Sequence, residues 1–265
     1  MTLIRSLVRH NSKLKDTFQP PLLQVTNLSR DFGGVGALAM VSFSISPGEI
    51  VGVIGPNGAG KTTLFALLSG FLTLSHGEIR FLETPIAGMR PDKVCHLGMA
   101  RTFQLVRPFL EMTVFENVKA GIVFGKPGRR PAAEIHREVD EILKSTGLSN
   151  LAHHISHSLS LPERKRLEVA RTMATHPKLL LLDEVLAGLN PREIEEAIPF
   201  IRSLNSERKI TILMVEHNLR AIMGICRRIL VLNFGQLIFD GTPEEAVENP
   251  EVIRAYLGKK EDAQG

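Results

Sequence analysis

The chain has 265 residues, 43% of them hydrophobic, which is enough to bury the core of one domain of ordinary size. Its 32 basic and 28 acidic residues leave a net charge of +4 that is scattered along the sequence, which argues against a dedicated nucleic-acid-binding protein with one concentrated basic face. No apolar run reaches the roughly 18 residues that cross a bilayer, and the two cysteines, Cys95 and Cys226, lack the spacing of a metal site.

Residues 1–19 are basic and carry apolar side chains at helix-like spacing. We expect a flexible extension here; a short amphipathic helix that contacts a partner or a membrane is the alternative. The main domain is expected over residues 20–258, followed by a tail at residues 259–265. Because the first segment lacks the apolar centre of a signal peptide, the chain is expected to stay inside the cell with reduced thiols.

Short apolar segments predict the strands of an α/β fold. Antiparallel strands are predicted at "LLQVTNL" and "VSFSI", and buried parallel strands at "IVGVI", "KLLLLDE" and "KITILMVEH". A late hairpin is predicted to turn at residues 233–235, before a helical tail. Helical spacing dominates from about residue 88 to residue 175. We therefore expect a mixed, largely parallel sheet, an antiparallel β subdomain and an inserted α-helical subdomain.

The segment "GPNGAGKTT" follows the predicted strand "IVGVI" and leads into a predicted helix, "LFALLSG". Its spacing is that of a phosphate-binding P-loop, in which backbone N–H groups surround a phosphate at a helix N-terminus. The lysine neutralises phosphate oxygens and the hydroxyl after it ligates Mg²⁺. These residues predict a site for a nucleoside triphosphate, made of Gly55, Pro56, Asn57, Gly58, Ala59, Gly60, Lys61, Thr62 and Thr63.

Further motifs follow the P-loop in a fixed order. They are "RTFQ", "LSLPERKRLEVAR", the carboxylate pair after four leucines in "LLLLDE", "AGLNP" and "VEHN". Together with the P-loop, they resemble the ATP-binding cassette (ABC) family of transport ATPases over residues 20 to about 258. The resemblance implies a P-loop NTPase core that binds ATP and Mg²⁺ and hydrolyses the ATP.

The resemblance also implies roles for single residues. Phe32 matches the aromatic residue that stacks on adenine, and Gln104 matches the glutamine that reaches Mg²⁺ and the attacking water. Asp183 matches the aspartate on the Mg²⁺ side, Glu184 the general base, and His217 the histidine that contacts the γ-phosphate. Mg²⁺ would thus be held with Thr62, Gln104 and Asp183.

The family's signature sequence lies at the start of a helix and is usually Leu-Ser-Gly-Gly-Gln. Here the corresponding residues are Leu159, Ser160, Leu161, Pro162 and Glu163. Ser160 and Glu163 have the spacing of a capping box, and Pro162 is tolerated in a first helical turn, so the helix start is expected to survive. The basic residues 164–166 are expected to form a solvated helix face. Asn190 replaces the aspartate that is common at the dimer interface of the family.

Among ABC ATPases, "ARTFQLVRPFLEMTVFENVKAG" and "GTPEEAVENPEVIRAYLG" look like those of branched-chain, hydrophobic amino-acid importers. The resemblance implies a homodimer, or a heterodimer with a paralogue, in which ATP lies between the P-loop of one copy and residues 159–163 of the other. Further partners would be two transmembrane permease subunits and, indirectly, a solute-binding protein, with no nucleic acid. The expected location is peripheral, on the cytoplasmic face of the inner membrane.

Several alternatives stay open at this point. The urea or short-chain amide importers and the lipopolysaccharide-export ATPase are near neighbours of the same family. A soluble cassette ATPase that acts on chromatin, repair or ribosomes belongs to another class, but such proteins usually carry two cassettes or a long coiled-coil insertion. A small-molecule kinase would share the P-loop, yet it would have no need of a capped signature helix or a distant histidine.

Overall fold

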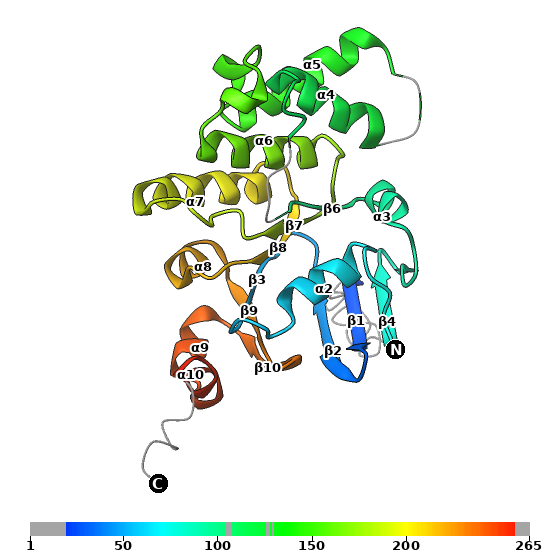
Figure 1. Ribbon diagram of the computed structural model, residues 1–265, viewed down its shortest axis with the longest axis vertical. Helices are drawn as coiled ribbons and strands as arrows, with labels where there is room; N and C mark the ends of the chain where they lie inside the picture. The colour runs from blue at the N-terminus through cyan, green and yellow to red at the C-terminus, as the bar shows by residue number, and fades with distance from the viewer. Residues whose placement is uncertain (1–19, 104–107, 126–127, 129, 258–265) are drawn as a thin grey trace, which may run out of the picture.

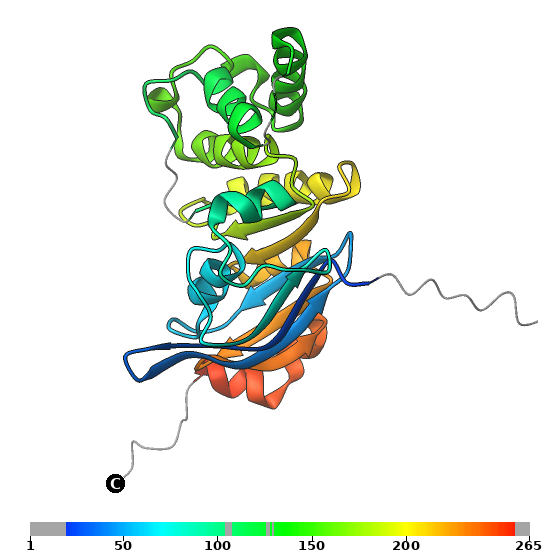
Figure 2. The same ribbon diagram turned by 90° about the vertical axis from the view of Figure 1, so that its right-hand side faces the viewer.

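The computed structural model describes residues 20–103, 108–125, 128 and 130–257. The extension and the tail expected at residues 1–19 and 259–265 lie outside this range, as does Gln104. The helices α4 (Val114–Gly125), α5 (Ala132–Ser145) and α6 (Leu161–Met173) form one end of the molecule. The antiparallel sheet and the C-terminal helices α9 (Pro243–Glu248) and α10 (Pro250–Leu257) form the other (Figure 1 and Figure 2). A mixed, largely parallel sheet lies between them.

An antiparallel sheet of four strands has the order β2-β1-β4-β5. Its strands are β1 (Leu23–Phe32), β2 (Val35–Ile45), β4 (His76–Phe81) and β5 (Thr84–Pro85). β1 pairs with both β2 and β4, and the register of both pairings shifts around Asn27, whose φ of 48° lies in the left-handed region. Along β1, the buried Leu23, Val25 and Leu28 are separated by exposed residues, because only one face of this sheet covers the core.

The central sheet has six strands in the order β10-β9-β3-β8-β7-β6. Five of them run parallel, and the sixth, β10, returns antiparallel to β9. The bounds are β3 (Ile50–Ile54), β6 (Met99–Arg101), β7 (Leu179–Asp183), β8 (Thr211–Val215), β9 (Arg228–Asn233) and β10 (Gln236–Gly241). Every residue of β7 and β8 is buried, as expected for parallel strands that are covered on both faces.

The two faces of the central sheet contribute to separate cores. On one face, Val51, Leu181 and Leu213 pack with the antiparallel sheet and with α2 (Lys61–Leu68). On the other face, Leu182 and Met214 pack with α7 (Pro191–Ser206), α8 (Leu219–Ile225), α9 (Pro243–Glu248) and α10 (Pro250–Leu257). This two-sided cover explains why the strand segments appear in the sequence as unbroken apolar runs.

The inserted helices are α4 (Val114–Gly125), α5 (Ala132–Ser145) and α6 (Leu161–Met173). Their own core includes Leu143 and Leu167, whereas Val169 and Met173 of the same α6 pack into the core of the sheet. The backbones of α4 and α6 approach each other closely at Gly121, where an added Cβ would lie 2.6 Å from the Arg171 carbonyl oxygen. Helix α6 therefore belongs to two cores at once.

The predicted fold class is confirmed, with a mixed and largely parallel sheet, an antiparallel subdomain and inserted helices. The hairpin at residues 233–235 is also present as β9 and β10. One detail differs from the prediction. The segment from residue 88 onward, which was predicted to be helical, contains the strand β6 after the short helix α3 (Pro91–Leu97). A strand of only three residues leaves no periodic pattern in the sequence. Within the described residues, no helix combines the length and the apolar character needed to span a membrane.

Candidate functional site

The loop between β3 and α2 adopts a conformation that requires glycine. Gly55, Gly58 and Gly60 have φ values of 151°, 80° and 102°, all in the region that L side chains rarely adopt. A Cβ at Gly60 would also lie 2.6 Å from the Ala37 carbonyl oxygen, and a Cβ at Gly55 would overlap the Leu232 carbonyl. These glycines let the backbone turn tightly at the N-terminus of α2, where free N–H groups attract anions.

Lys61 is the first residue of α2, and its side chain turns back over the loop. Its Nζ donates hydrogen bonds to the carbonyl oxygens of Gly55, at 2.6 Å, and Pro56, at 2.9 Å. Burial lowers the pKa of Lys61, and the nearby Glu184 carboxylate opposes this effect. The next residue, Thr62, is exposed and Thr63 is half-buried. The segment thus presents an ammonium group, backbone amides and a hydroxyl at one place.

The carboxylate pair stands at the end of β7, beside β8. Asp183 is buried and accepts a hydrogen bond from Arg101 Nη2 at 2.7 Å on its Oδ2 atom. Glu184 has a left-handed φ of 50°, and its Oε1 lies 3.0 Å from Nε2 of His217, which follows β8. A left-handed φ at a non-glycine residue is uncommon and is typical of functional sites. Adjacent parallel strands therefore bring together Asp183, Glu184 and His217.

Two buried ionisable side chains bind the backbone of residues 184 and 186, and the sequence pattern predicts neither of them. Lys165 Nζ, from α6, donates to the Glu184 carbonyl oxygen at 3.1 Å. The prediction of a solvated face for residues 164–166 is therefore wrong for Lys165, which is 7% exposed. Glu216 is 3% exposed and accepts a hydrogen bond from the Leu186 N–H at 2.8 Å; burial raises its pKa to about 7.

The predicted signature segment forms the start of α6, as its capping box indicates. The Glu163 carboxylate accepts hydrogen bonds from both the N–H and the hydroxyl of Ser160, each at 2.7 Å, and these bonds lower the pKa of Glu163. Pro162 lies in the first turn, and Leu161 is exposed. In the described part of the chain, no hydrogen bond joins residues 160–163 to residues 55–63.

Two other predicted residues have local partners. Phe32 ends β1 with 44% of its surface exposed, and the Arg30 guanidinium lies 4.7 Å from the centre of its ring. Asn190 is the N-cap of α7, where its side-chain oxygen accepts a hydrogen bond from the Glu193 N–H at 3.0 Å. Thus the Asn190 side chain is used in a helix cap within its own chain.

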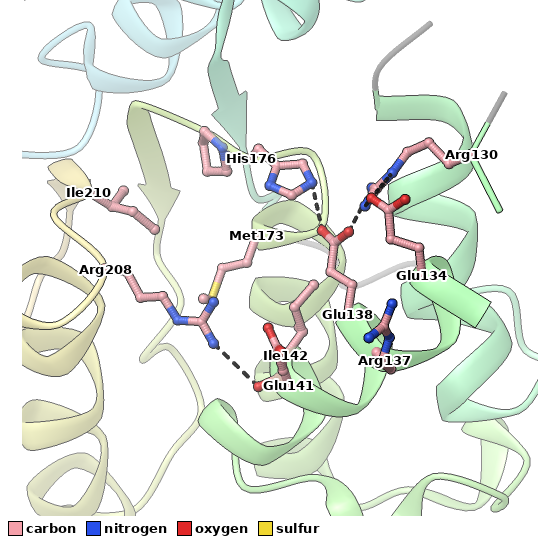
Figure 3. A pocket seen from close by; sticks show the side chains of 11 residues that line it. Arg130, Glu134, Arg137, Glu138, Glu141, Ile142, Met173, His176, Arg208 and Ile210 are labelled. Atoms are coloured by element: carbon pink, nitrogen blue, oxygen red, sulfur yellow. Dashed lines mark hydrogen bonds and ion pairs between the residues drawn. The ribbon is translucent and has the colours of Figure 1, made fainter. Parts of the chain in front are cut away.

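A charged pocket of about 500 Å³ lies apart from these residues, at the junction of α5 with the sheet (Figure 3). Glu138, on α5, forms an ion pair of 2.6 Å with Arg130, and its Oε1 lies 2.6 Å from Nε2 of His176, in the turn between α6 and β7. Arg208, in the loop before β8, donates to the Glu141 carbonyl oxygen at 3.3 Å. None of the predicted site residues lines this pocket. The contacts of Glu138 with His176 and of Arg208 with Glu141 connect α5 to the loops that precede β7 and β8.

Comparison with known proteins places this arrangement in a family. A family model described as "ABC transporter" matches residues 38–187, more than half of the chain, and includes the P-loop and the carboxylate pair. The chain belongs to the ABC transporter family. A second model, described as "Branched-chain amino acid ATP-binding cassette transporter", matches residues 236–262 of this cassette.

Curated relatives and solved structures agree with the family assignment. The ABC cassette is 42% identical over 251 residues to the high-affinity branched-chain amino acid transport ATP-binding protein LivG of Salmonella typhimurium, covering 90% of this chain and 98% of that protein. It is 39% identical over 251 residues to BraF of Pseudomonas aeruginosa, with the same two coverages. The ADP conformation of another ABC transporter cassette superimposes with a TM-score of 0.80 at 30% identity, covering 91% of this chain and 100% of that one. As a member of this family, the cassette binds nucleotide and hydrolyses ATP.

Proposed function

We propose that this ABC cassette is the ATPase subunit of an importer for branched-chain, hydrophobic amino acids. The match of its C-terminal segment to the branched-chain family model supports this substrate class, as do the names of the LivG and BraF relatives. The chemistry itself rests on one observation. The P-loop, the two carboxylates at the end of β7 and the histidine after β8 lie at the ends of neighbouring parallel strands, β3, β7 and β8.

The P-loop residues 55–63 would hold the phosphates of ATP, with Lys61 exchanging its bonds to the loop carbonyls for phosphate oxygens. Mg²⁺ at a nucleotide takes one or two protein ligands besides the phosphates. The exposed Thr62 hydroxyl and the Asp183 carboxylate suit that donor set, and no group of three acidic, His or Cys side chains in the described residues suggests another metal site. Bound there, Mg²⁺ would neutralise phosphate charge. Gln104 is proposed to complete this side of the site.

Glu184 is proposed as the general base that orients the attacking water, and His217, 3.0 Å from it, as the group that contacts the γ-phosphate. The Glu184 backbone is fixed by two hydrogen bonds, since its N–H donates to the Val215 carbonyl oxygen at 3.0 Å and its carbonyl oxygen accepts from Lys165. This fixed backbone, with its left-handed φ, directs the Glu184 side chain toward His217.

A second copy of the cassette, or a paralogue, would close the site. In this proposal the start of α6, with residues 160–163, faces the P-loop of the partner, and Asn190 lies near the same interface. The positive end of the α6 dipole suits the γ-phosphate, although Pro162 removes one backbone donor. Phe32 would stack on the adenine of the nucleotide bound to its own P-loop.

Two permease subunits are proposed as membrane partners, with a solute-binding protein acting through them. The exposed rings of Phe71 and Phe103 contact each other edge to face, with their centres 5.4 Å apart, and Phe109 and Leu110 are also exposed. Exposed apolar side chains of this kind suit a protein interface. The cassette would then sit peripherally on the cytoplasmic face of the membrane.

ATP binding and hydrolysis by purified variants test the assigned roles. Glu184→Gln should bind ATP normally while phosphate release falls by two or more orders of magnitude, roughly the loss of one catalytic group. Lys61→Ala should instead weaken ATP binding itself, and Glu196→Gln, on the exposed face of α7, is the matched control. Hydrolysis near the control level in Glu184→Gln would reject the role of Glu184.

Uptake measurements test the substrate class separately. Vesicles that contain the cassette with its two permease subunits should accumulate labelled leucine when ATP is enclosed with the solute-binding protein outside. Accumulation of labelled urea in place of leucine would overturn the amino-acid assignment and leave the ATPase assignment intact.

A further inference from the structure

Arg101, the last residue of β6, and the two residues after it form hydrogen bonds with Asp183 and with α6. The Arg101 side chain binds the Asp183 carboxylate, and the Thr102 hydroxyl oxygen accepts a hydrogen bond from the Asp183 N–H at 2.9 Å. The Phe103 N–H donates to a carboxylate oxygen of Glu168, on α6, at 2.5 Å. Asp183 is therefore held by its side chain from Arg101, the last residue of β6, and by its backbone from Thr102, the residue that follows.

The position of Arg101 is itself fixed from several sides. Its Nη1 donates to the Ser69 hydroxyl, at the end of α2, at 3.2 Å. Its guanidinium carbon lies 5.8 Å from the ring centre of Phe65 and 5.3 Å from that of Phe103. Only 8% of the Arg101 side chain and 5% of the Asp183 side chain are exposed. A guanidinium packed in this way cannot follow Asp183 to another orientation.

The chemistry of the pair follows from this rigidity. Arg101 Nη2 binds Oδ2 of Asp183 at 2.7 Å, so that rotation of the carboxylate would break a buried charged hydrogen bond. A carboxylate that is held by an outer hydrogen bond binds a metal without first losing rotational freedom. Lysine would keep the charge at position 101 but would lose the planar fork that reaches Ser69 and Asp183 together.

We propose that Arg101 is a positioning residue for the Mg²⁺ side of the nucleotide site. It fixes the orientation of Asp183 and thereby sets the affinity of the nucleotide-bound site for its divalent cation. This inference rests on the proposed function, because it takes Asp183 as the carboxylate on the Mg²⁺ side. No sequence motif for this pairing was predicted, since the two residues are 82 positions apart in the chain.

The test measures metal affinity directly, with Mn²⁺ as the probe. Binding of Mn²⁺ to the purified cassette with a non-hydrolysable ATP analogue is followed by electron paramagnetic resonance, and nucleotide affinity without metal is measured alongside. Loss of an outer hydrogen-bond partner typically lowers metal affinity by about 10- to 100-fold. Arg101→Met should show a loss of that size, with unchanged metal-free nucleotide affinity. Arg101→Lys should show a smaller loss in the same direction.

Two further variants complete the design. Arg192→Met removes an arginine whose side chain is 88% exposed on α7, and it should leave Mn²⁺ affinity unchanged. If Arg101→Met does not fold, Ser69→Ala removes only the hydroxyl that supports the guanidinium and should still lower Mn²⁺ affinity by a few-fold.

The results separate the failure of this inference from a failure of the proposed function. Equal Mn²⁺ affinity in the wild-type protein and in Arg101→Met or, failing that variant, in Ser69→Ala would overturn the role of Arg101. An equal loss of metal-free nucleotide affinity would also overturn it, because Arg101 would then act on the nucleotide. Absence of nucleotide-dependent Mn²⁺ binding in the wild-type protein would instead reject the proposed metal site.

Discussion

Replacement of Glu216 by glutamine should make the stability of the cassette less sensitive to pH. Glu216 is buried beside His217, and its pKa is raised from 4.5 to about 7, first by burial and also by the nearby Glu184 carboxylate. The hydrogen bond from the Leu186 N–H and the charge of Lys165 oppose the rise. Glutamine keeps an oxygen that can accept the Leu186 bond but carries no charge.

The sign follows from proton linkage. When the folded pKa of an acid is higher than the unfolded pKa, its stabilising contribution is complete below the unfolded value and is lost as pH rises through the folded value. For Glu216 this window runs from about pH 4.5 to about pH 7. Since one pKa unit corresponds to about 1.4 kcal/mol, Glu216→Gln should gain about 2 to 3 kcal/mol of unfolding free energy, relative to wild type, between pH 5 and pH 8.

Urea unfolding followed by circular dichroism at pH 5, 6, 7 and 8 measures this difference, and the contributions of other titrating groups largely cancel between the two proteins. Glu195→Gln is the matched control, because Glu195 is an exposed carboxylate paired with Arg220, and its difference from wild type should be nearly flat. A flat difference for Glu216→Gln as well, or a difference that falls as pH rises, would refute the assignment of a raised pKa to Glu216.

Two further predictions concern local conformation. Gly60→Ala should lower both stability and ATP affinity, measured by urea unfolding and by fluorescent-nucleotide titration, because its Cβ would lie 2.6 Å from the Ala37 carbonyl oxygen. Gly58→Ala meets nothing within 4 Å and should cost only the strain of its φ, about 1 kcal/mol; equal losses in both variants would contradict this steric reasoning. Ser160→Ala should cost about 1 kcal/mol of unfolding free energy by removing the cap of α6, and an unchanged urea midpoint would count against the capping box.

The features that were predicted from the sequence are those encoded by neighbouring residues. The P-loop is recognisable because Gly55, Gly60 and Lys61 must stand at a fixed spacing between a strand and a helix. The start of α6 is recognisable because Ser160 and Glu163 bind each other within one turn. Such signals need no knowledge of the rest of the fold.

The features that were missed depend on contacts between distant segments. Arg101 and Asp183 meet only because β6 and β7 are adjacent in the sheet. Lys165 was expected in solvent because charged residues usually mark the outer face of a helix, but α6 lies between two cores and leaves little of its surface outside. Glu216 carries no local sign that its carboxyl group will be buried. Sequence periodicity describes one buried face per helix and cannot reveal a second.

Helix α6 also determines how the molecule comes apart. Leu167 packs among the inserted helices, while Val169 and Met173 pack against the central sheet. Unfolding of either part, here called the helical lobe and the sheet lobe, would therefore expose apolar surface of the same helix to water. The free energies of opening of the two lobes are therefore linked. We expect heat or denaturant to unfold the cassette in one cooperative step, with no long-lived species in which only the helical lobe has been lost.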